Sequence, residues 1–432
     1  MKEMFKSIAK SFSVLLISIV CGAILLGIVY SLPTNRIITN ASKSKDLYYD
    51  NMIKSWNGNS RYGKLDTTTD AIMISNAVSR CYDSIIKNAL LNGRYSYTDA
   101  SKDDSNQESL YRYLNGEIPD ENIEYARYWH GYLIWMIPGL YFFDTGGLRT
   151  IMMFVQFFLV VLVLNEFSKI SKLLMINYCF IFCFMSPITT SMNFANANCN
   201  CLLLLSLVFI LKFNAWLIKN NRFVYFFLIS GILTMYFDFF TYPIVVWGIP
   251  LITFIAINKF SIKESFDIFI KTTIAWFFGY LGMWVGKCLI ATLLTDVNVI
   301  KEATDRLLHW TIADSNNYSN VSFFDSFKRN IETFDNPMLA LLISNVIVIL
   351  IWIVRYFNNV KSNIKNRECV LLPVLLLVLI GLSTFVWYYV VRVPSYIHPW
   401  YHYRILAIFI WSITSSSYYL IDNNQKNTII NV

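Results

Sequence analysis

Charged residues are scarce in this chain of 432 residues. They make up 15% of it, whereas hydrophobic residues make up 56% and aromatic residues 17%. A soluble globular protein has about 25% charged residues. The shortage is uneven, because residues 33–127 are polar while most of 128–432 consists of apolar blocks of about 16–25 residues. Helices of that length cross a hydrocarbon core of ~30 Å. The composition excludes a soluble enzyme, a disulfide scaffold, a disordered chain and a single-span receptor, and it predicts an all-α polytopic membrane protein.

Several motifs are also missing. The sequence has no phosphate-binding loop, dinucleotide fingerprint, His-Glu-x-x-His or Gly-x-Ser-x-Gly. The eight cysteines lie mostly in or beside apolar blocks and lack the spacing of a zinc site. We therefore predict no metal site and no certain cofactor, and leave open a divalent cation, Mg²⁺ or Mn²⁺. The net charge of +8 forms no basic stripe away from the membrane-flanking segments, so no nucleic-acid partner is expected.

The apolar blocks predict about ten transmembrane helices. These are residues 11–32, 148–167, 173–190, 197–214, 223–238, 243–258, 267–291, 337–355, 370–390 and 404–421. With the N-terminus inside, every short inner connection carries Lys or Arg, whereas the short outer turns at 189–196 and 239–242 carry neither. This distribution follows the positive-inside rule and places both termini in the cytoplasm.

The same topology divides the chain into five parts. They are the first transmembrane helix (1–32), an extracytoplasmic loop with interfacial or re-entrant helices (33–147), transmembrane helices two to seven (148–291), a second extracytoplasmic loop (292–336), and transmembrane helices eight to ten with a cytoplasmic tail (337–432). Residues 128–143 are apolar, but Gly131, Pro138 and Gly139 make them a poor span. Counting them as a span would also place every later loop on the opposite side of the membrane. We therefore place them at the outer interface, with Tyr128, Trp129 and Tyr132 at the level of the lipid headgroups.

Three acidic residues on the outer side are candidates for catalysis. Asp66 and Asp70 stand four residues apart in the first outer loop. Asp70 is the predicted general base for a sugar hydroxyl, with Asp66 orienting the substrate or helping to hold a cation. The alternative is that Asp66 caps a helix and Asp70 lies in its first turn. Asp238 lies at the outer end of an apolar block, where an acid implies a function or a structural partner.

Arginine and histidine residues gather on the same side. Arg392 and Arg404 flank an aromatic segment at the membrane boundary, and Arg127 precedes another aromatic cluster. Because a guanidinium group binds phosphate through two parallel hydrogen bonds, these three are predicted to hold a lipid phosphate; interfacial anchoring is the alternative. The predicted substrate-binding residues are aromatic or histidine residues in or beside the outer segments: Trp129, His130, His309, His398 and His402. Pro399 interrupts any helix joining the last two, which argues against a two-histidine metal site.

One span, a long outer loop with the Asp66-x-x-x-Asp70 pair, and then many further spans resemble the glycosyltransferase GT-C superfamily. The likeness is greatest to its bacterial members that use polyprenyl-phosphate sugars. This resemblance implies a catalytic acid in the first outer loop, here Asp70 or Asp66. It implies that Arg127, Arg392 or Arg404 holds the donor phosphate. The adjacent acid pair common in the superfamily is replaced here by acids four residues apart, which leaves the identity of the base open.

The expected function is that of a hexosyltransferase-like enzyme in the bacterial cytoplasmic membrane. It would move a sugar from a polyprenyl-phosphate donor to a cell-surface glycan or lipid-linked acceptor on the extracytoplasmic face, with inversion. Two alternatives remain open. One is a polysaccharide polymerase of the O-antigen or capsule type. The other is a non-enzymatic flippase or transporter of lipid-linked glycans, although the chain shows no internal repeat of the kind common in transporters.

Overall fold

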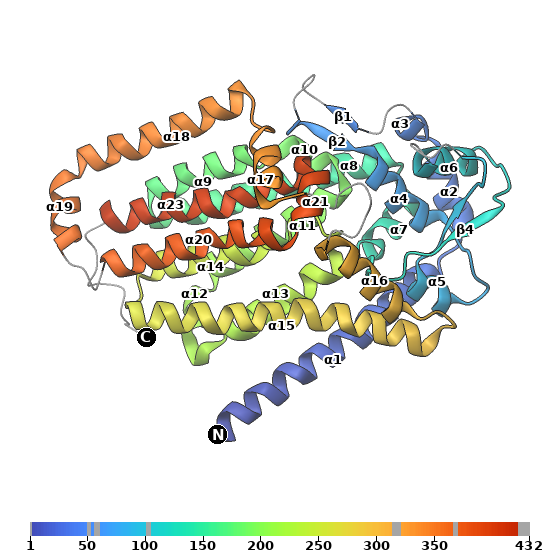
Figure 1. Cartoon of the computed structure of the whole chain (residues 1–432), viewed down its shortest axis with the longest axis horizontal. Coiled ribbons are helices and arrows are strands. Elements are labelled where there is room, and N and C mark those ends of the chain that lie inside the picture. The colour runs from blue at the N-terminus through green and yellow to red at the C-terminus, as the bar shows by residue number, and fades with distance from the viewer. Residues whose placement is uncertain are drawn as a thin grey trace.

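A computed structural model describes residues 2–49, 53–55, 61–100, 105–312, 321–365 and 370–421. Each of the ten predicted transmembrane segments contains an α-helix: α1 (Lys2–Tyr30), α8 (Thr145–Ile170), α9 (Lys172–Phe184), α11 (Phe194–Lys212), α13 (Phe223–Phe237), α14 (Val245–Asn258), α15 (Ile262–Leu294), α18 (Asn336–Arg355), α20 (Leu372–Val390) and α23 (Leu406–Ile421). These helices run side by side along the long axis of the molecule (Figure 1).

Within the described residues, seven helices are long and apolar enough to cross a membrane. They are α1, α8, α11, α15, α18, α20 and the segment Pro399–Ile421, which ends in α23. Their outward surfaces are apolar: Phe154 on α8 is 70% exposed and Val354 on α18 is 74% exposed. A continuous apolar surface on parallel helices is what a lipid bilayer requires. The chain is therefore a helical polytopic membrane protein, as its composition predicts.

The polar region after α1 folds into short elements at one end of the bundle (Figure 1). They are α2 (Thr34–Ser42), α3 (Asp46–Tyr49), β1 (Ile53–Ser55), β2 (Lys64–Asp66), α4 (Thr67–Val78), α5 (Ile85–Leu91), β3 (Arg94–Ser96), α6 (Ser105–Leu114) and β4 (Glu121–Ile123). β1 pairs with β2 and β3 pairs with β4, both antiparallel. The described chain is predominantly helical, as the predicted all-α class requires, and these two short strand pairs satisfy the backbone polar groups of the extended segments.

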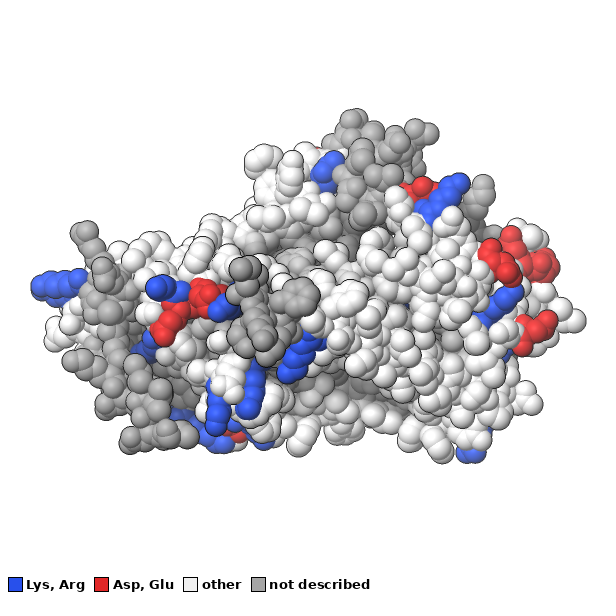
Figure 2. All heavy atoms as spheres, turned by 90° about the horizontal axis from the view of Figure 1, so that it is seen from below, with Lys and Arg blue, Asp and Glu red and all other residues white. Residues whose placement is uncertain are grey.

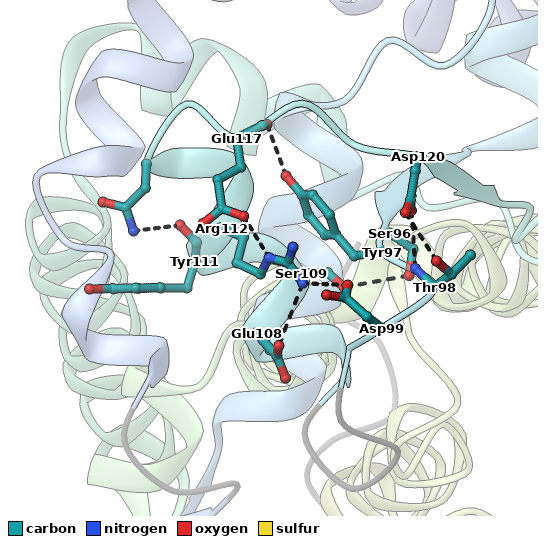
Figure 3. Close-up of polar contacts among 11 residues, drawn as sticks. Ser96, Tyr97, Thr98, Asp99, Glu108, Ser109, Tyr111, Arg112, Glu117 and Asp120 are labelled. Atoms are coloured by element: carbon teal, nitrogen blue, oxygen red, sulfur yellow. Dashed lines mark hydrogen bonds and ion pairs between the residues drawn. The ribbon is translucent and has the colours of Figure 1, made fainter.

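Arg112 joins three segments of this polar region (Figure 3). Its Nε donates to Glu117 Oε2 at 2.7 Å, and its Nη1 donates to Asp99 Oδ1 at 2.7 Å. Asp120 fastens the same region, because it accepts hydrogen bonds from the backbone and hydroxyl of Thr98, each at 3.0 Å. These acids are thus used for local structure, and the cluster fixes the link between β3, α6 and β4.

Residues 128–143 contain the short helix α7 (Leu133–Phe142), which packs against α1, α2, α4 and α8. Trp129 and Tyr132 are fully buried, and the Trp129 indole donates to the Met283 carbonyl at 2.7 Å. The prediction that Trp129 and Tyr132 lie among lipid headgroups is therefore wrong. The reason is that this aromatic segment fills the space between the polar region and the bundle instead of facing outward.

The predicted span at 173–190 is also interrupted. α9 ends at Phe184, and the next helix, α10 (Pro187–Met192), begins after Ser186, whose φ is +57°. Proline disfavours a helical conformation in the residue before it and cannot donate to the preceding turn, so the helix breaks there. The break lets α10 turn toward β2.

The remaining elements connect the long helices. They are α12 (Asn214–Ile218), η1 (Lys219–Asn221), α16 (Val299–Ile312), α17 (Phe323–Ile331), α19 (Phe357–Lys365), α21 (Arg392–Ile397), α22 (Pro399–His402) and η3 (Tyr403–Ile405). In Figure 1, α19 lies at the end of the bundle opposite α2–α6, whereas α16 and α21 lie nearer to α2–α6. Figure 2 shows charged side chains gathered toward both ends of one face, with an uncharged area between them.

α13 and α15 cross with their backbones in close contact. A Cβ on Gly231 would collide with the Trp276 carbonyl, and one on Gly279 would collide with the Leu228 carbonyl. Small residues at such a crossing let two backbones touch, which is a common way to stabilise helix pairs in membranes. α13 leads directly into the Asp238 turn described below, so this crossing fixes the position of that turn.

Gly279→Ala should therefore destabilise the protein. Because the neighbouring atom is a backbone carbonyl, the helices would have to separate, and we expect a loss of about 1–3 kcal/mol. Thermal unfolding of the purified protein in detergent measures this. Gly27→Ala is the matched control, since a Cβ there meets nothing within 4 Å. Equal melting temperatures for the two variants would contradict the close crossing.

Candidate functional site

A cavity of about 380 Å³ lies where four distant segments of the chain meet. The segments are the start of α4, the stretch after β4, the turn after α13, and the α21–α22 region. The lining residues are Asp66, Thr68, Thr69, Ile72, Tyr125, Arg127, Tyr128, Phe239, Phe240, Pro394, His398, Trp400, Tyr401 and His402. The wall thus combines one carboxylate, one guanidinium group, two imidazoles and several aromatic rings, which is a composition suited to a polar ligand with a ring.

Asp66 is the carboxylate of this wall. It is the N-cap of α4: its Oδ1 accepts from the Thr69 backbone at 2.8 Å, and its Oδ2 accepts from the Thr69 hydroxyl at 2.9 Å. The Trp400 indole donates to Oδ2 at 3.3 Å. In the described part of the chain no Lys or Arg forms an ion pair with Asp66. The carboxylate is therefore oriented by neutral donors and keeps its negative charge available to the cavity.

Asp70 lies one turn further along α4, behind the cavity wall, and is fully buried. Arg149 of α8 donates to its Oδ2 at 2.9 Å. Its other oxygen accepts from the Asn193 side chain at 3.0 Å and from the Phe194 backbone at 2.9 Å. Burial raises the pKa of Asp70 to about 6, against the opposing attraction of Arg149. Asp70 is paired with Arg149 and is not in the cavity wall, whereas Asp66 lines the cavity and has no ion-pair partner among the described residues, so the geometry favours Asp66 as the acid that meets a substrate.

Asp238 supports the wall from outside it. It is buried at the end of α13 and accepts from the Thr241 backbone at 3.1 Å and the Thr241 hydroxyl at 2.6 Å. The turn that it closes contains Phe239 and Phe240, which line the cavity, and Phe240 has a φ of +59°. The structural alternative for Asp238 matches this arrangement, because its partner is Thr241 in the turn that it closes; it does not cap the next helix, α14. Its carboxylate is not part of the cavity wall.

The three predicted phosphate-binding arginines occupy different environments. Arg127 lines the cavity; its Nη1 donates to Glu302 of α16 at 2.8 Å, and its buried Nε has no hydrogen-bond partner among the described residues. Arg404 is fully buried and donates to the carbonyls of Met185 and Trp400, so it is used to join helices. Arg392 is partly exposed at the start of α21 and is not in the wall.

Two of the histidines lie in the wall. The Nδ1 of His398 is buried and, within the described residues, unpartnered; burial lowers the pKa of His398, although Asp66 opposes this. The Nδ1 of His402 is 3.1 Å from the Ser395 hydroxyl. As predicted, Pro399 separates the two, because α22 begins at that residue. Among the described residues no group of three or more His, Cys, Asp or Glu residues could hold a metal ion.

Two other predicted substrate-binding residues, His130 and Trp129, are not in the wall. Both nitrogens of His130 have protein partners, the Tyr132 hydroxyl at 3.0 Å and the Tyr125 carbonyl at 2.8 Å. Trp129 is buried against α15, as described above, so direct substrate contact is wrong for both residues in this structure. His309 belongs to α16, but its side chain lies outside the described part of the molecule.

Sequence reasoning missed several residues of the wall. Thr68 and Thr69 lie between the two predicted acids, and Tyr125 precedes the predicted Arg127 cluster. Tyr401 lies in the wall and donates its hydroxyl to Asn193 Oδ1 at 3.3 Å. Asn193 also donates to the Asp66 carbonyl at 3.0 Å, and so links both acids to the α22 segment. The only sequence signal for these residues is their closeness to the charged candidates.

No protein-family model, curated protein or solved structure matches this chain. The function must therefore be argued from the geometry of the cavity and from the chemistry of its wall.

Removing Arg149 should destabilise the protein strongly. Arg149→Met leaves the Asp70 carboxylate buried without its charge partner, which typically costs about 3–5 kcal/mol. Adding Asp70→Asn should restore much of the loss, because no unpaired buried charge then remains. The free energies of unfolding of the single and double variants measure this coupling.

Lys169→Met is the control for this cycle. Lys169 pairs with Glu166 at 2.8 Å, but its side chain is 59% exposed, so the change should cost less than about 1 kcal/mol. An Arg149→Met loss as small as that of the control would show that Asp70 does not depend on its partner.

Proposed function

We propose that this protein is a membrane glycosyltransferase of the GT-C type. It moves a sugar from a polyprenyl-phosphate donor to a cell-surface glycan or lipid-linked acceptor. The observation that carries the proposal is Asp66, an unneutralised carboxylate in the wall of a cavity of about 380 Å³ that also contains Arg127, His398 and aromatic rings. Aromatic faces beside polar groups suit sugar rings, and a carboxylate beside them suits removal of a hydroxyl proton.

In the proposed topology the chain crosses the membrane ten times, and the cavity opens on the extracytoplasmic face of a bacterial cytoplasmic membrane. α9, α13 and α14 are apolar but only 13, 15 and 14 residues long, so they would cross with help from flanking residues and neighbouring helices. Two features support this arrangement: the basic inner connections in the sequence, and the position of the polar region at one end of the bundle (Figure 1).

The proposed reaction is a single displacement at the anomeric carbon. The acceptor hydroxyl gives its proton to Asp66, and its oxygen forms a bond to the anomeric carbon. The bond between that carbon and the phosphate oxygen breaks, and its electron pair leaves with the polyprenyl phosphate. Attack from the face opposite to the leaving group inverts the anomeric centre.

Arg127 is suited to stabilise the departing phosphate. Its buried Nε has no hydrogen-bond partner within the described part of the chain, and its guanidinium group lies 4.3 Å from the Tyr125 ring centroid, which holds it in place. The Glu302 partner fixes one end of the same group. A preorganised cation facing developing negative charge lowers the barrier without reorganisation at the moment of reaction. Burial lowers the pKa of His398, and its buried Nδ1, unpartnered within the described residues, offers a hydrogen-bonding group for the sugar.

Asp66→Asn should abolish most transfer activity while the protein still folds. Loss of a general base typically costs 10²–10⁴-fold in rate. The measurement is transfer from a radiolabelled polyprenyl-phosphate sugar by the purified protein in liposomes, using mixed bacterial envelope glycans and glycolipids as acceptors. The length of the product separates single-sugar transfer from polymerisation.

Asp267→Asn is the matched control, because Asp267 lies near the start of α15 and its ion-pair partner among the described residues is Lys271, both well exposed. Asp70→Asn and Asp238→Asn should lower thermal stability more than they lower the rate per folded molecule. Full transfer activity in Asp66→Asn would remove the proposed base. Movement of the labelled lipid across the membrane with no new glycosidic bond would instead favour a flippase.

A further inference from the structure

A group of three basic side chains, here the basic cluster, lies near the cavity but is not part of its wall. It consists of Arg61, Lys64 of β2 and Arg329 of α17. Lys64 Nζ lies 5.7 Å from the centroid of the Trp400 ring. In the part of the chain that the structure describes, neither Lys64 nor Arg329 has a carboxylate within ion-pair distance. Arg61 has one, Glu332 at 3.4 Å, and both side chains are about half exposed.

Arg61 lies three residues before Lys64 in the chain, and its ion-pair partner Glu332 lies one turn after Arg329, which brings the three cations together. Burial lowers the pKa of the Lys64 ammonium, and the positive charges of Arg61 and Arg329 lower it further. Arg329 is held in place, since its guanidinium group lies 4.3 Å from the centroid of the Tyr396 ring. Its helix is fixed to α21, because the Asn330 side chain donates to the Ser395 carbonyl at 2.9 Å. Among the described residues these cations outnumber the carboxylates that pair with them, and such a site is stabilised by an external anion.

The basic cluster is connected to Asp66 through one residue. The face of the Trp400 ring is turned to Lys64, while its indole nitrogen donates to the Asp66 carboxylate. Arg127 comes from a different part of the wall and has its own acidic partner, Glu302. The site thus has two separate positive centres, Arg127 and the basic cluster. Trp400 contacts both Lys64 of the basic cluster and Asp66.

An apolar pocket of about 220 Å³ is lined by residues that lie close in sequence to the basic cluster. Its wall includes Tyr62, which lies between Arg61 and Lys64, and Pro337, Met338 and Leu341 at the start of α18. α18 follows closely after Arg329 and Glu332, and its outer surface is apolar, with Ile343 60% exposed. A pocket of this kind, placed between an anion site and a membrane-facing helix, matches a phosphate that carries a hydrocarbon chain.

We propose that Lys64, Arg329 and Arg61 bind the phosphate of a second lipid, and that the apolar pocket holds the first part of its hydrocarbon chain. This lipid is the acceptor of the reaction, which makes the acceptor a lipid-linked phosphate; this assignment rests on the proposed function. In a single displacement the base lies on the acceptor's side and the leaving group on the opposite side. The cation tied to Asp66 therefore serves the acceptor, and Arg127 serves the donor.

Counting bound lipids tests this proposal. The full-length protein in detergent micelles is mixed with undecaprenyl phosphate, and native mass spectrometry counts the copies bound. Two saturable copies are expected. The double variant Lys64→Gln/Arg329→Gln should keep one copy, Arg127→Gln should keep the other, and the triple variant should keep none. Lys64→Gln alone or Arg329→Gln alone should weaken the copy bound at the basic cluster about tenfold, which corresponds to ~1.4 kcal/mol.

Two controls separate the head group from the chain. Arg222→Gln removes a similar arginine, 4.7 Å from the Trp216 ring centroid, in the α12–α13 connection, and should change nothing. Leu341→Trp fills the apolar pocket and should weaken only the copy that depends on Lys64. Undecaprenol, which has the chain without the charge, should not saturate either site. Inorganic phosphate should not displace the lipid at equal concentration.

The remaining outcomes overturn the proposal. If only one lipid copy binds, and both Arg127→Gln and the Lys64→Gln/Arg329→Gln double variant lose it, then the arginine and the basic cluster form one shared site. Displacement by inorganic phosphate, or binding of undecaprenol as strong as that of the phosphate, would exclude a lipid-phosphate subsite. The proposed function is tested separately by Asp66→Asn, which should bind both lipids yet transfer nothing. If Asp66→Asn binds two lipids and keeps full transfer activity, Asp66 is not the base, but the second lipid site is still supported.

Discussion

The buried carboxylate of Asp70 is the interaction on which the site depends. It binds Arg149 of α8, the Asn193 side chain and the Phe194 backbone, and so fixes the polar α4 to two long helices of the bundle. Asp66, one turn earlier on α4, is thereby held at the cavity. Asn193 strengthens the link, because it also contacts the Asp66 carbonyl and the Tyr401 hydroxyl. A buried charge of this kind is costly unless it is fully paired, which makes the attachment specific.

Three other contacts bring the remaining wall into place. The Asp238 turn orients Phe239 and Phe240 after α13, and the close α13–α15 crossing sets where that turn lies. The Arg127–Glu302 pair joins the polar region to α16. On the opposite side, Arg404 bonds the carbonyls of Met185 and Trp400 and fixes α22 to the end of α9. Most of the rare charges near the site thus hold the cavity together, and few of them face it.

The predicted site residues fall into two groups, those that lie in the cavity wall and those that support it. Asp66, Arg127, His398 and His402 were predicted from the sequence and lie in the cavity wall. Asp70, Asp238, Arg404, His130 and Trp129 were predicted by the same reasoning and are used to support the wall. Charged residues near a membrane boundary are rare whether they line a site or support its wall, because placing a charge there costs free energy in both cases. Spacing along the chain cannot separate them: Asp66 is the N-cap of α4 and Asp70 lies in its first turn, yet only Asp66 is in the cavity wall.

The sequence by itself determined the membrane class, the positions of the long helices and the polar region beside them. These features depend on local hydrophobicity and on segment length relative to bilayer thickness, both of which can be read along the chain. Only the tertiary structure decided which carboxylate meets the cavity, where α9 gives way to α10, and that Lys64 lies beside Trp400. Those outcomes depend on contacts between residues as far apart as Asp66 and Trp400, which no local pattern encodes.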